Sequence, residues 1–248
     1  MHYFLRSVKK ILKIIFSYLK FPFVIRSYIL FKKKDKGLRF EMPVTQVFPC
    51  LFDNTTFTRF DTHYIYHTAW AARKVKELGV AKHVDISSSL YFSSIVSAFV
   101  PVDFYDYRPA KLGLSNLSSH QGDLLGLPFA DNSLPSISCM HTIEHVGLGR
   151  YGDPLDPDGD IKAVKELIRV TKKGGAIIFV VPVGKPRIQF NAHRIYPYAM
   201  IMQMFEGCNL KEFSLIPDNA LEKGMLFHAN PFLVASQSYG CGCFVFVK

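Results

Sequence analysis

The sequence predicts an α/β domain with a doubly wound, mostly parallel sheet, preceded by a basic amphipathic helical arm. Between Ser118 and Val183, an acidic turn, a strand, a glycine-rich loop, a helix, a Gly-Gly turn and a second strand follow in order. That second strand, Ala176–Val181, is almost wholly apolar, as parallel strands are when helices cover both faces. The order indicates a Rossmann-like architecture, in which ligands bind beyond the carboxyl ends of the strands.

The distribution of charge divides the chain into an arm and a main domain. Residues 1–39 hold eleven of the thirty Lys and Arg residues and one of the twenty acids, so the other 209 residues are neutral overall. A neutral main domain does not favour nucleic acid as a partner. We expect an arm over residues 1–39, a linker over 40–59 and a single α/β domain over 60–248.

The arm is expected to form an amphipathic helix. Its lysines lie largely apart from a set of apolar residues at helical spacing, namely Leu5, Val8, Leu12, Ile15, Phe16 and Leu19. Pro22 is expected to break this helix. No uncharged run reaches the roughly 20 residues that a membrane span needs. We therefore expect residues 1–37 to bind an anionic membrane surface, with the protein cytoplasmic and peripheral to the membrane. The alternative is a helix that packs on its own domain.

The first half of the domain is predicted from capping and turn residues. Asp61 or Thr62 caps a helix over Phe60–Leu78, and Gly79 ends it. Three strands and a short helix follow. Their predicted ranges are 82–87 for the first strand, Leu90–Phe99 for the helix, 101–109 for the second strand and Ser136–His141 for the third.

The second half is predicted from apolar periodicity. A helix over Asp160–Lys173 is expected to begin at an Asp160 cap and to end at Gly174-Gly175, before the strand Ala176–Val181. The remaining predicted elements are a helix over Tyr196–Phe205 and strands over Asn209–Ile216 and Gly242–Val247.

The cysteines do not suggest a disulfide framework or a metal site. Five cysteines are an odd and sparse set, which indicates reducing surroundings. Cys241 and Cys243 lie on one face of a predicted strand, but a metal site would need two more ligands, and none lies nearby in the sequence. His141, Glu144 and His145 spell H-x-x-E-H, a zinc-protease motif that needs a helix to bring its histidines together. Because strand and loop are predicted there, we expect no metal.

Polar side chains gather after the strand Ser136–His141, where chemistry is expected. His145 is the candidate base, since neutral imidazole accepts a proton near neutral pH, and the alternative is a histidine that holds the loop. Glu144 and Arg150 are the other catalytic candidates, and Arg150 could instead pair with an aspartate to fix the loop. The candidate substrate-binding residues are Asp153, His193 and Arg194, with helix capping as the alternative for the last two.

Several motifs resemble those of class I S-adenosylmethionine-dependent methyltransferases, over roughly residues 60–248. Acids end the first two strands at Asp85 and Asp106, and Gly122-Asp123 is followed by LPFADNS and IEHV. The resemblance implies S-adenosylmethionine as cofactor, with Asp106 on the ribose and Asp123 near the adenine; turn capping is the alternative for both. The implied cofactor-binding residues are Asp85, Ser87, Ser89, Asp106, Asp123, Leu124 and His141.

The segments HVDISS, VDFYDYRP, HTIEHVGLGRYGDPLDPDG and FNAHRIY resemble, more narrowly, an uncharacterised methyltransferase-like family. Some members are encoded among genes for surface polysaccharides, so the resemblance implies O-methylation of a polar, carbohydrate-like acceptor. Where the superfamily has a glycine-rich turn, residues 85–91 read DISSSLY, and serine lacks the freedom of glycine at positive φ. The alternative is therefore a non-catalytic, degenerate methyltransferase fold that binds partners while tethered to a membrane.

Overall fold

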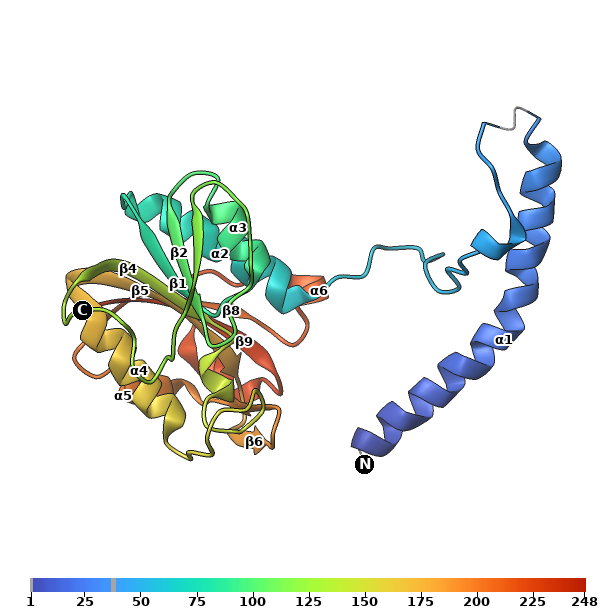
Figure 1. Cartoon of the computed structure of the whole chain (residues 1–248). Helices are drawn as coiled ribbons and strands as arrows, with labels where there is room; N and C mark the ends of the chain where they lie inside the picture. The colour runs from blue at the N-terminus through green and yellow to red at the C-terminus, as the bar shows by residue number, and fades with distance from the viewer. Residues whose placement is uncertain (1, 37–38) are drawn as a thin grey trace. The chain divides into compact units, whose positions relative to one another are not determined.

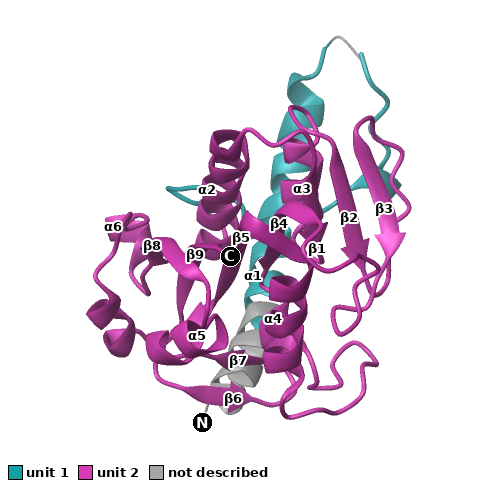
Figure 2. Ribbon diagram, turned by 90° about the vertical axis from the view of Figure 1, so that its left-hand side faces the viewer, with its two compact units in different colours: residues 1–59 teal, residues 60–248 magenta. Residues whose placement is uncertain are grey.

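The computed structural model describes residues 2–36 and 39–248, with side chains from residue 15 onward. The chain forms two compact units, residues 1–59 and 60–248, which Figure 2 shows in different colours. The first unit consists of helix α1 (His2–Lys34), a short 3₁₀ turn η1 (Val44–Gln46) and extended segments. Tyr28 donates a hydrogen bond to the carbonyl of Met42, so the segment after α1 runs back beside the helix.

The expected break at Pro22 is wrong, because Pro22 lies inside the continuous helix α1. A proline removes one backbone hydrogen bond and strains the turn before it, while a 33-residue helix keeps its bonds on both sides. The side chains of Leu5, Val8 and Leu12 lie outside the described residues. No described helix is both long and apolar enough to cross a membrane.

The second unit is built on a seven-stranded sheet, which confirms the predicted doubly wound, mostly parallel architecture (Figure 1). The strand order is β3-β2-β1-β4-β5-β9-β8. The first five strands pair in parallel, and β9 pairs antiparallel with both β5 and β8. The strands are β1 (His83–Ile86), β2 (Val102–Asp106), β3 (Leu117–Gln121), β4 (Leu134–Met140), β5 (Thr171–Val183), β8 (Asn209–Ile216) and β9 (Gly240–Val247).

Helices cover both faces of this sheet (Figure 1). On one face, α2 (Thr62–Leu78) and α3 (Leu90–Val96) bury Trp70 and Phe92 against the strands. On the other face, α4 (Gly159–Val170) and α5 (Tyr198–Met204) pack against a separate cluster that includes Phe179. The remaining elements are the turns η2 (Ile143–His145) and η3 (Pro231–Ser236), the helix α6 (Ala220–Lys223), and a small hairpin of β6 (Arg187–Gln189) and β7 (His193–Ile195).

The capping predictions were correct for α2 and wrong for α4. The Asp61 side chain accepts from the N–H of Tyr64, and Gly79 ends α2 in the left-handed conformation. Helix α4 ends at Val170, because Thr171 already pairs with Leu134 as the first residue of β5. The N-cap position of α4 is occupied by Asp158. The predicted cap, Asp160, is instead buried in the first turn of α4.

Candidate functional site at the carboxyl ends of the strands

Two cavities lie at the carboxyl ends of β1, β2 and β4, and both are lined by His141 and His145. The first, the strand-end cavity, has a volume of about 210 Å³. The second, the histidine cavity, has a volume of about 450 Å³. Among the residues predicted for the site, the strand-end cavity is lined by Ser87, Asp106, Asp123, Leu124 and Asp153, and the histidine cavity by Glu144, Arg150 and His193.

Asp106 and Asp123 hold neighbouring turns with one carboxylate oxygen each. Asp106 Oδ1 accepts from the N–H of Arg108 at 2.7 Å, and Asp123 Oδ1 accepts from the N–H of Leu125 at 2.9 Å. Each carboxylate therefore keeps its second oxygen as an acceptor toward the strand-end cavity. Gly122 allows these two turns to approach, because a Cβ there would lie 3.0 Å from the ring of Tyr105.

The serine-rich turn after β1 takes the strained conformation that glycine would adopt easily. Ser87 has φ of +53°, and its N–H donates to the carbonyl of Tyr105 at 2.8 Å. Thr142 donates to the carbonyl of Ser87 at 3.0 Å, and Ser88 accepts from the N–H of Met140 at 3.1 Å. These bonds to β2 and to the end of β4 hold the left-handed residue in place.

Two residues predicted to contact the cofactor, Asp85 and Ser89, line neither cavity. Asp85 is fully buried and accepts hydrogen bonds from Ser93 and Ser138, each at 2.5 Å. Burial raises the pKa of Asp85 to about 6, although these serine hydroxyls act in the opposite direction. Asp85 thus joins β1, α3 and β4 beneath the turn. Tyr91 is 81% exposed, so its ring does not fill the strand-end cavity.

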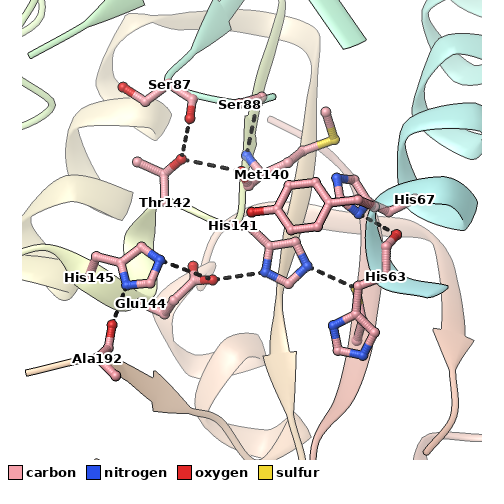
Figure 3. A network of polar contacts seen from close by, with 12 residues as sticks. His63, His67, Ser87, Ser88, Met140, His141, Thr142, Glu144, His145 and Ala192 are labelled. Carbon is pink, nitrogen blue, oxygen red and sulfur yellow. Dashed lines mark hydrogen bonds and ion pairs between the residues drawn. The ribbon is translucent and has the colours of Figure 1, made fainter. Parts of the chain in front are cut away.

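His141 and His145 both lie beside Glu144 at the point where the two cavities meet, His141 within hydrogen-bond distance and His145 farther away (Figure 3). The Nδ1 atom of His141 lies 2.9 Å from Glu144 Oε1, and His145 Nε2 lies 3.9 Å from the same oxygen. The side chain of Glu144 is only 1% exposed. Burial alone would raise the pKa of Glu144, but the hydrogen bond and the charge of His141 hold it below its usual value.

The orientation of His145 is set by the loop before β7. His145 Nδ1 lies 2.6 Å from the carbonyl oxygen of Ala192, so Nδ1 carries the proton that it donates. In the neutral ring, Nε2 then has the free lone pair. Burial lowers the pKa of His145, which keeps the ring neutral at physiological pH. Arg150 donates to the same carbonyl at 3.1 Å.

The loop after η2 is organised by Asp153 and by glycines. Asp153 accepts from the N–H groups of Gly147, Gly149 and Tyr151, so its carboxylate holds the loop as well as lining the strand-end cavity. A Cβ at Gly147 would lie 2.0 Å from the carbonyl oxygen of Asp156. This close approach requires glycine.

Of the two substrate-binding candidates on β7, His193 lies at the site and Arg194 lies beneath it. His193 lines the histidine cavity, and its buried Nε2 atom has no hydrogen-bond partner among the described residues. Arg194 lines neither cavity and is 5% exposed. It donates to the carbonyls of Val146, Asp156 and Pro157, and so holds the loop from below.

The histidine cavity also contains residues that the sequence analysis missed: His63, Tyr64, Asp218 and Tyr239. The ring of His63 stacks on His141 with centroids 5.6 Å apart and on Tyr239 at 5.1 Å. Burial and the neighbouring His141 lower the pKa of His63 to about 4. The only sequence signal was the i, i+4 pair of His63 and His67 on α2, which places two histidines on one helix face.

Comparison with protein families identifies a match over the centre of this site. A family model described as Caenorhabditis protein of unknown function, DUF268, matches residues 130–222. This range includes β4, the loop after it, α4, β5 and β7. A search of curated proteins finds no match to the sequence.

Solved structures resemble the chain in fold. A candidate sarcosine dimethylglycine methyltransferase from Galdieria sulphuraria is 15% identical, with a TM-score of 0.53 over 74% of this chain and 86% of that one. The YcgJ protein from Bacillus subtilis is 14% identical, with a TM-score of 0.52 over 74% and 98%. A candidate methyltransferase, solved with the Haloferax volcanii Trm112 methyltransferase activator, is 18% identical, with a TM-score of 0.50 over 73% and 89%. The chain therefore has the class I methyltransferase fold.

Proposed function

We propose that this chain transfers a methyl group from S-adenosylmethionine to an oxygen of a polar, carbohydrate-like acceptor. The observation that carries the proposal is the meeting of two cavities at His141 and His145. The strand-end cavity has the carboxylates of Asp106 and Asp123, and the histidine cavity has a polar lining. His145, the candidate base, lines both. A methyl donor and an acceptor need this arrangement, because in-line transfer depends mainly on positioning and proton removal.

The strand-end cavity fits the adenosine part of the cofactor. Asp106 and Asp123 each keep one carboxylate oxygen free of the turn that they hold, and these oxygens suit ribose hydroxyls and an adenine amino group. Leu124 and Leu125 add apolar surface for the base. When bound, the cofactor supplies an electrophilic methyl group. The fit supports cofactor binding through Asp106, Asp123, Leu124 and Ser87, while Asp85 supports the turn from beneath.

His145 is the proposed base of the reaction. Its Nε2 lone pair accepts the proton of the acceptor hydroxyl, because Nδ1 already donates to Ala192. The Glu144 carboxylate, 3.9 Å from Nε2, stabilises the imidazolium that forms. Arg150 and His193 line the same cavity and would hold polar groups of the acceptor.

The serine-rich turn supports an alternative, a non-catalytic domain that binds partners. Ser87 donates to Tyr105 and Ser88 accepts from Met140, so both serines bond to neighbouring strands of the protein. A glycine-rich turn would instead leave its backbone open to a ligand. In this alternative the strand-end cavity binds a different nucleoside-like ligand or none.

The arm supports recruitment to an anionic membrane surface. Its helix carries exposed apolar side chains, including Phe16, Phe23 and Phe31, and ends in three lysines. Apolar insertion together with lysine contacts to anionic headgroups is the usual basis of such binding.

Calorimetric titration of S-adenosylmethionine and S-adenosylhomocysteine into the full chain tests the proposal. We expect saturable binding that Asp106→Ala weakens at least tenfold. Asp131→Ala is the matched control, because Asp131 is an exposed carboxylate that lines neither cavity. Absence of binding to folded protein at millimolar ligand would reject methyl transfer and favour the non-catalytic alternative.

A further inference from the structure

Three side chains of types that can bind metal come together from distant parts of the sequence. His63 and His141 line the histidine cavity, and Cys241 lies next to it. His63 comes from the first turn of α2, His141 follows β4, and Cys241 lies in β9. Their ligand atoms all lie within 4.8 Å of one another. The closest pair is His141 Nε2 and Cys241 Sγ, at 3.4 Å.

These separations are close to those of a tetrahedral metal site. Zinc bonds of about 2.0–2.1 Å to nitrogen and 2.3 Å to sulfur place neighbouring ligand atoms roughly 3.3–3.6 Å apart. The His141–Cys241 pair already meets this spacing. His63 needs to move by about 1 Å to complete it, which is within reach of a side chain that lies at a cavity surface.

Glu144 orients His141 in the way that carboxylates orient metal-binding histidines. The hydrogen bond between His141 Nδ1 and Glu144 Oε1 keeps a proton on Nδ1, so a metal ion would bind at Nε2, on the side of Cys241, in place of the second proton of the charged ring. Such a carboxylate fixes both the tautomer and the ring orientation of a ligand.

Glu144 is balanced by charged His141 in the metal-free chain, and a bound cation would take over that role once His141 is a neutral ligand. Among the described residues, Glu144 forms ion pairs only with His141 and His145, and its Oε2 atom is buried without a hydrogen-bond partner. A divalent ion bound by a Cys241 thiolate would balance that thiolate and the Glu144 carboxylate together. Zinc suits a ligand set of two imidazoles and one thiolate.

We propose that His63, His141 and Cys241 bind a divalent metal ion of the zinc type, with Glu144 orienting His141. The protein supplies three ligands, and the fourth position faces the histidine cavity. Three protein ligands with one open position are typical of zinc sites that bind a water molecule or a ligand oxygen. The ion would therefore hold an oxygen atom of a small polar ligand beside Arg150 and His193.

The sequence analysis expected no metal, because it looked for ligands near Cys241 in the sequence and for a helical H-x-x-E-H. In the structure, His141 is the one histidine of that motif in the cluster. The other two ligands are His63 of α2 and Cys241 of β9. The metal site is argued from its own ligands and does not depend on methyl transfer.

Cobalt titration of the full chain, after removal of metal with a chelator, tests this site. We expect one Co²⁺ per chain, with a thiolate-to-cobalt charge-transfer band and intense visible bands of a tetrahedral site, both abolished by Zn²⁺. Glu144→Gln should keep the bands but weaken affinity by about 10–100-fold. Cobalt binding without cofactor binding would uphold the metal site while rejecting the proposed function.

Two cysteine variants locate the metal. Cys241→Ser should remove the charge-transfer band, whereas Cys139→Ser, which changes another buried thiol in the core cluster on the other face of the sheet, should keep it. Should Cys241→Ser fail to fold, His63→Ala provides the test, with loss of stoichiometric binding expected. A folded wild-type chain without the band, or a band that persists in Cys241→Ser, would overturn the proposal.

Discussion

The Nδ1 atom of His145 lies 2.6 Å from the carbonyl oxygen of Ala192, which ties the loop after β4 to the loop before β7. This one contact decides the tautomer of the ring and leaves Nε2 as its acceptor. It also brings residues 47 positions apart in the chain into direct contact.

Replacing His145 should separate catalysis from cofactor binding. We expect His145→Ala to lower methyl transfer by about 10²–10⁴-fold, as for loss of a general base, with cofactor affinity nearly unchanged. Transfer of labelled methyl groups from S-adenosylmethionine to a polysaccharide extract measures the first quantity, and calorimetry the second. His120→Ala is the control, because His120 lies on the edge strand β3 and lines neither cavity. Unchanged transfer would remove His145 from the mechanism.

Asp85 should make folding stability depend on pH. Its pKa is raised from 3.8 to about 6 by burial, so the folded state binds this proton more tightly than the unfolded state. Protonated Asp85 therefore contributes its full stabilisation of the folded state below the unfolded pKa of 3.8, and this stabilisation is lost as pH rises through 6. We expect wild-type stability to fall relative to Asp85→Asn by roughly 2 kcal/mol between pH 4 and pH 7. Urea unfolding at several pH values measures this, and a constant difference would contradict it.

Gly147 should tolerate alanine far less than Gly152. Both have positive φ, but nothing lies within 4 Å of a Cβ at Gly152, whereas one at Gly147 would meet the Asp156 carbonyl. Gly152→Ala should cost about 1–2 kcal/mol from conformation alone. Gly147→Ala should cost at least about 2 kcal/mol more, because backbone must move. Thermal unfolding compares the two, and equal losses would show that the loop adjusts freely.

Arg194 should stabilise the loop instead of binding substrate. Arg194→Met leaves three carbonyls without their donor in a buried setting, and we expect a loss of about 2–4 kcal/mol in unfolding free energy. Arg187→Met is the control, since Arg187 also donates to two carbonyls but lies at the surface. Cofactor affinity measured well below the unfolding temperature should match wild type for both variants.

The arm should bind membranes through its charge. Reversing Lys32, Lys33 and Lys34 to Glu in the full chain should abolish sedimentation with phosphatidylserine vesicles at low salt, since each lysine contributes about 1 kcal/mol. The same reversal at the exposed residues Lys172, Lys173 and Lys211 keeps the net charge change equal and should leave binding intact. Equal loss in both variants would show that net charge matters and that the arm has no special role.

Local sequence patterns predicted most elements of the sheet and its helices. The apolar run of β5 and the Asp61 and Gly79 caps of α2 are determined by residues close in sequence, which is why they were predicted correctly. The edge strand β3 was missed, because its exposed polar residues, LSSHQ, lack an apolar pattern and pair only through β2. The end of α4 was misplaced, because pairing between Leu134 and Thr171 begins the next strand early.

The sequence by itself determined the fold class, the basic arm and the positions of Asp106 and His145 at or just past strand ends, since periodicity, caps and strand order depend on near neighbours. Only the tertiary structure decided that Asp85 and Arg194 support the site from beneath it. It alone brought His63 and Cys241 to His141. The physical reason is that burial and side-chain contact depend on how β4, β9 and α2 pack, and no local pattern encodes the distance between residues 178 positions apart, as His63 and Cys241 are.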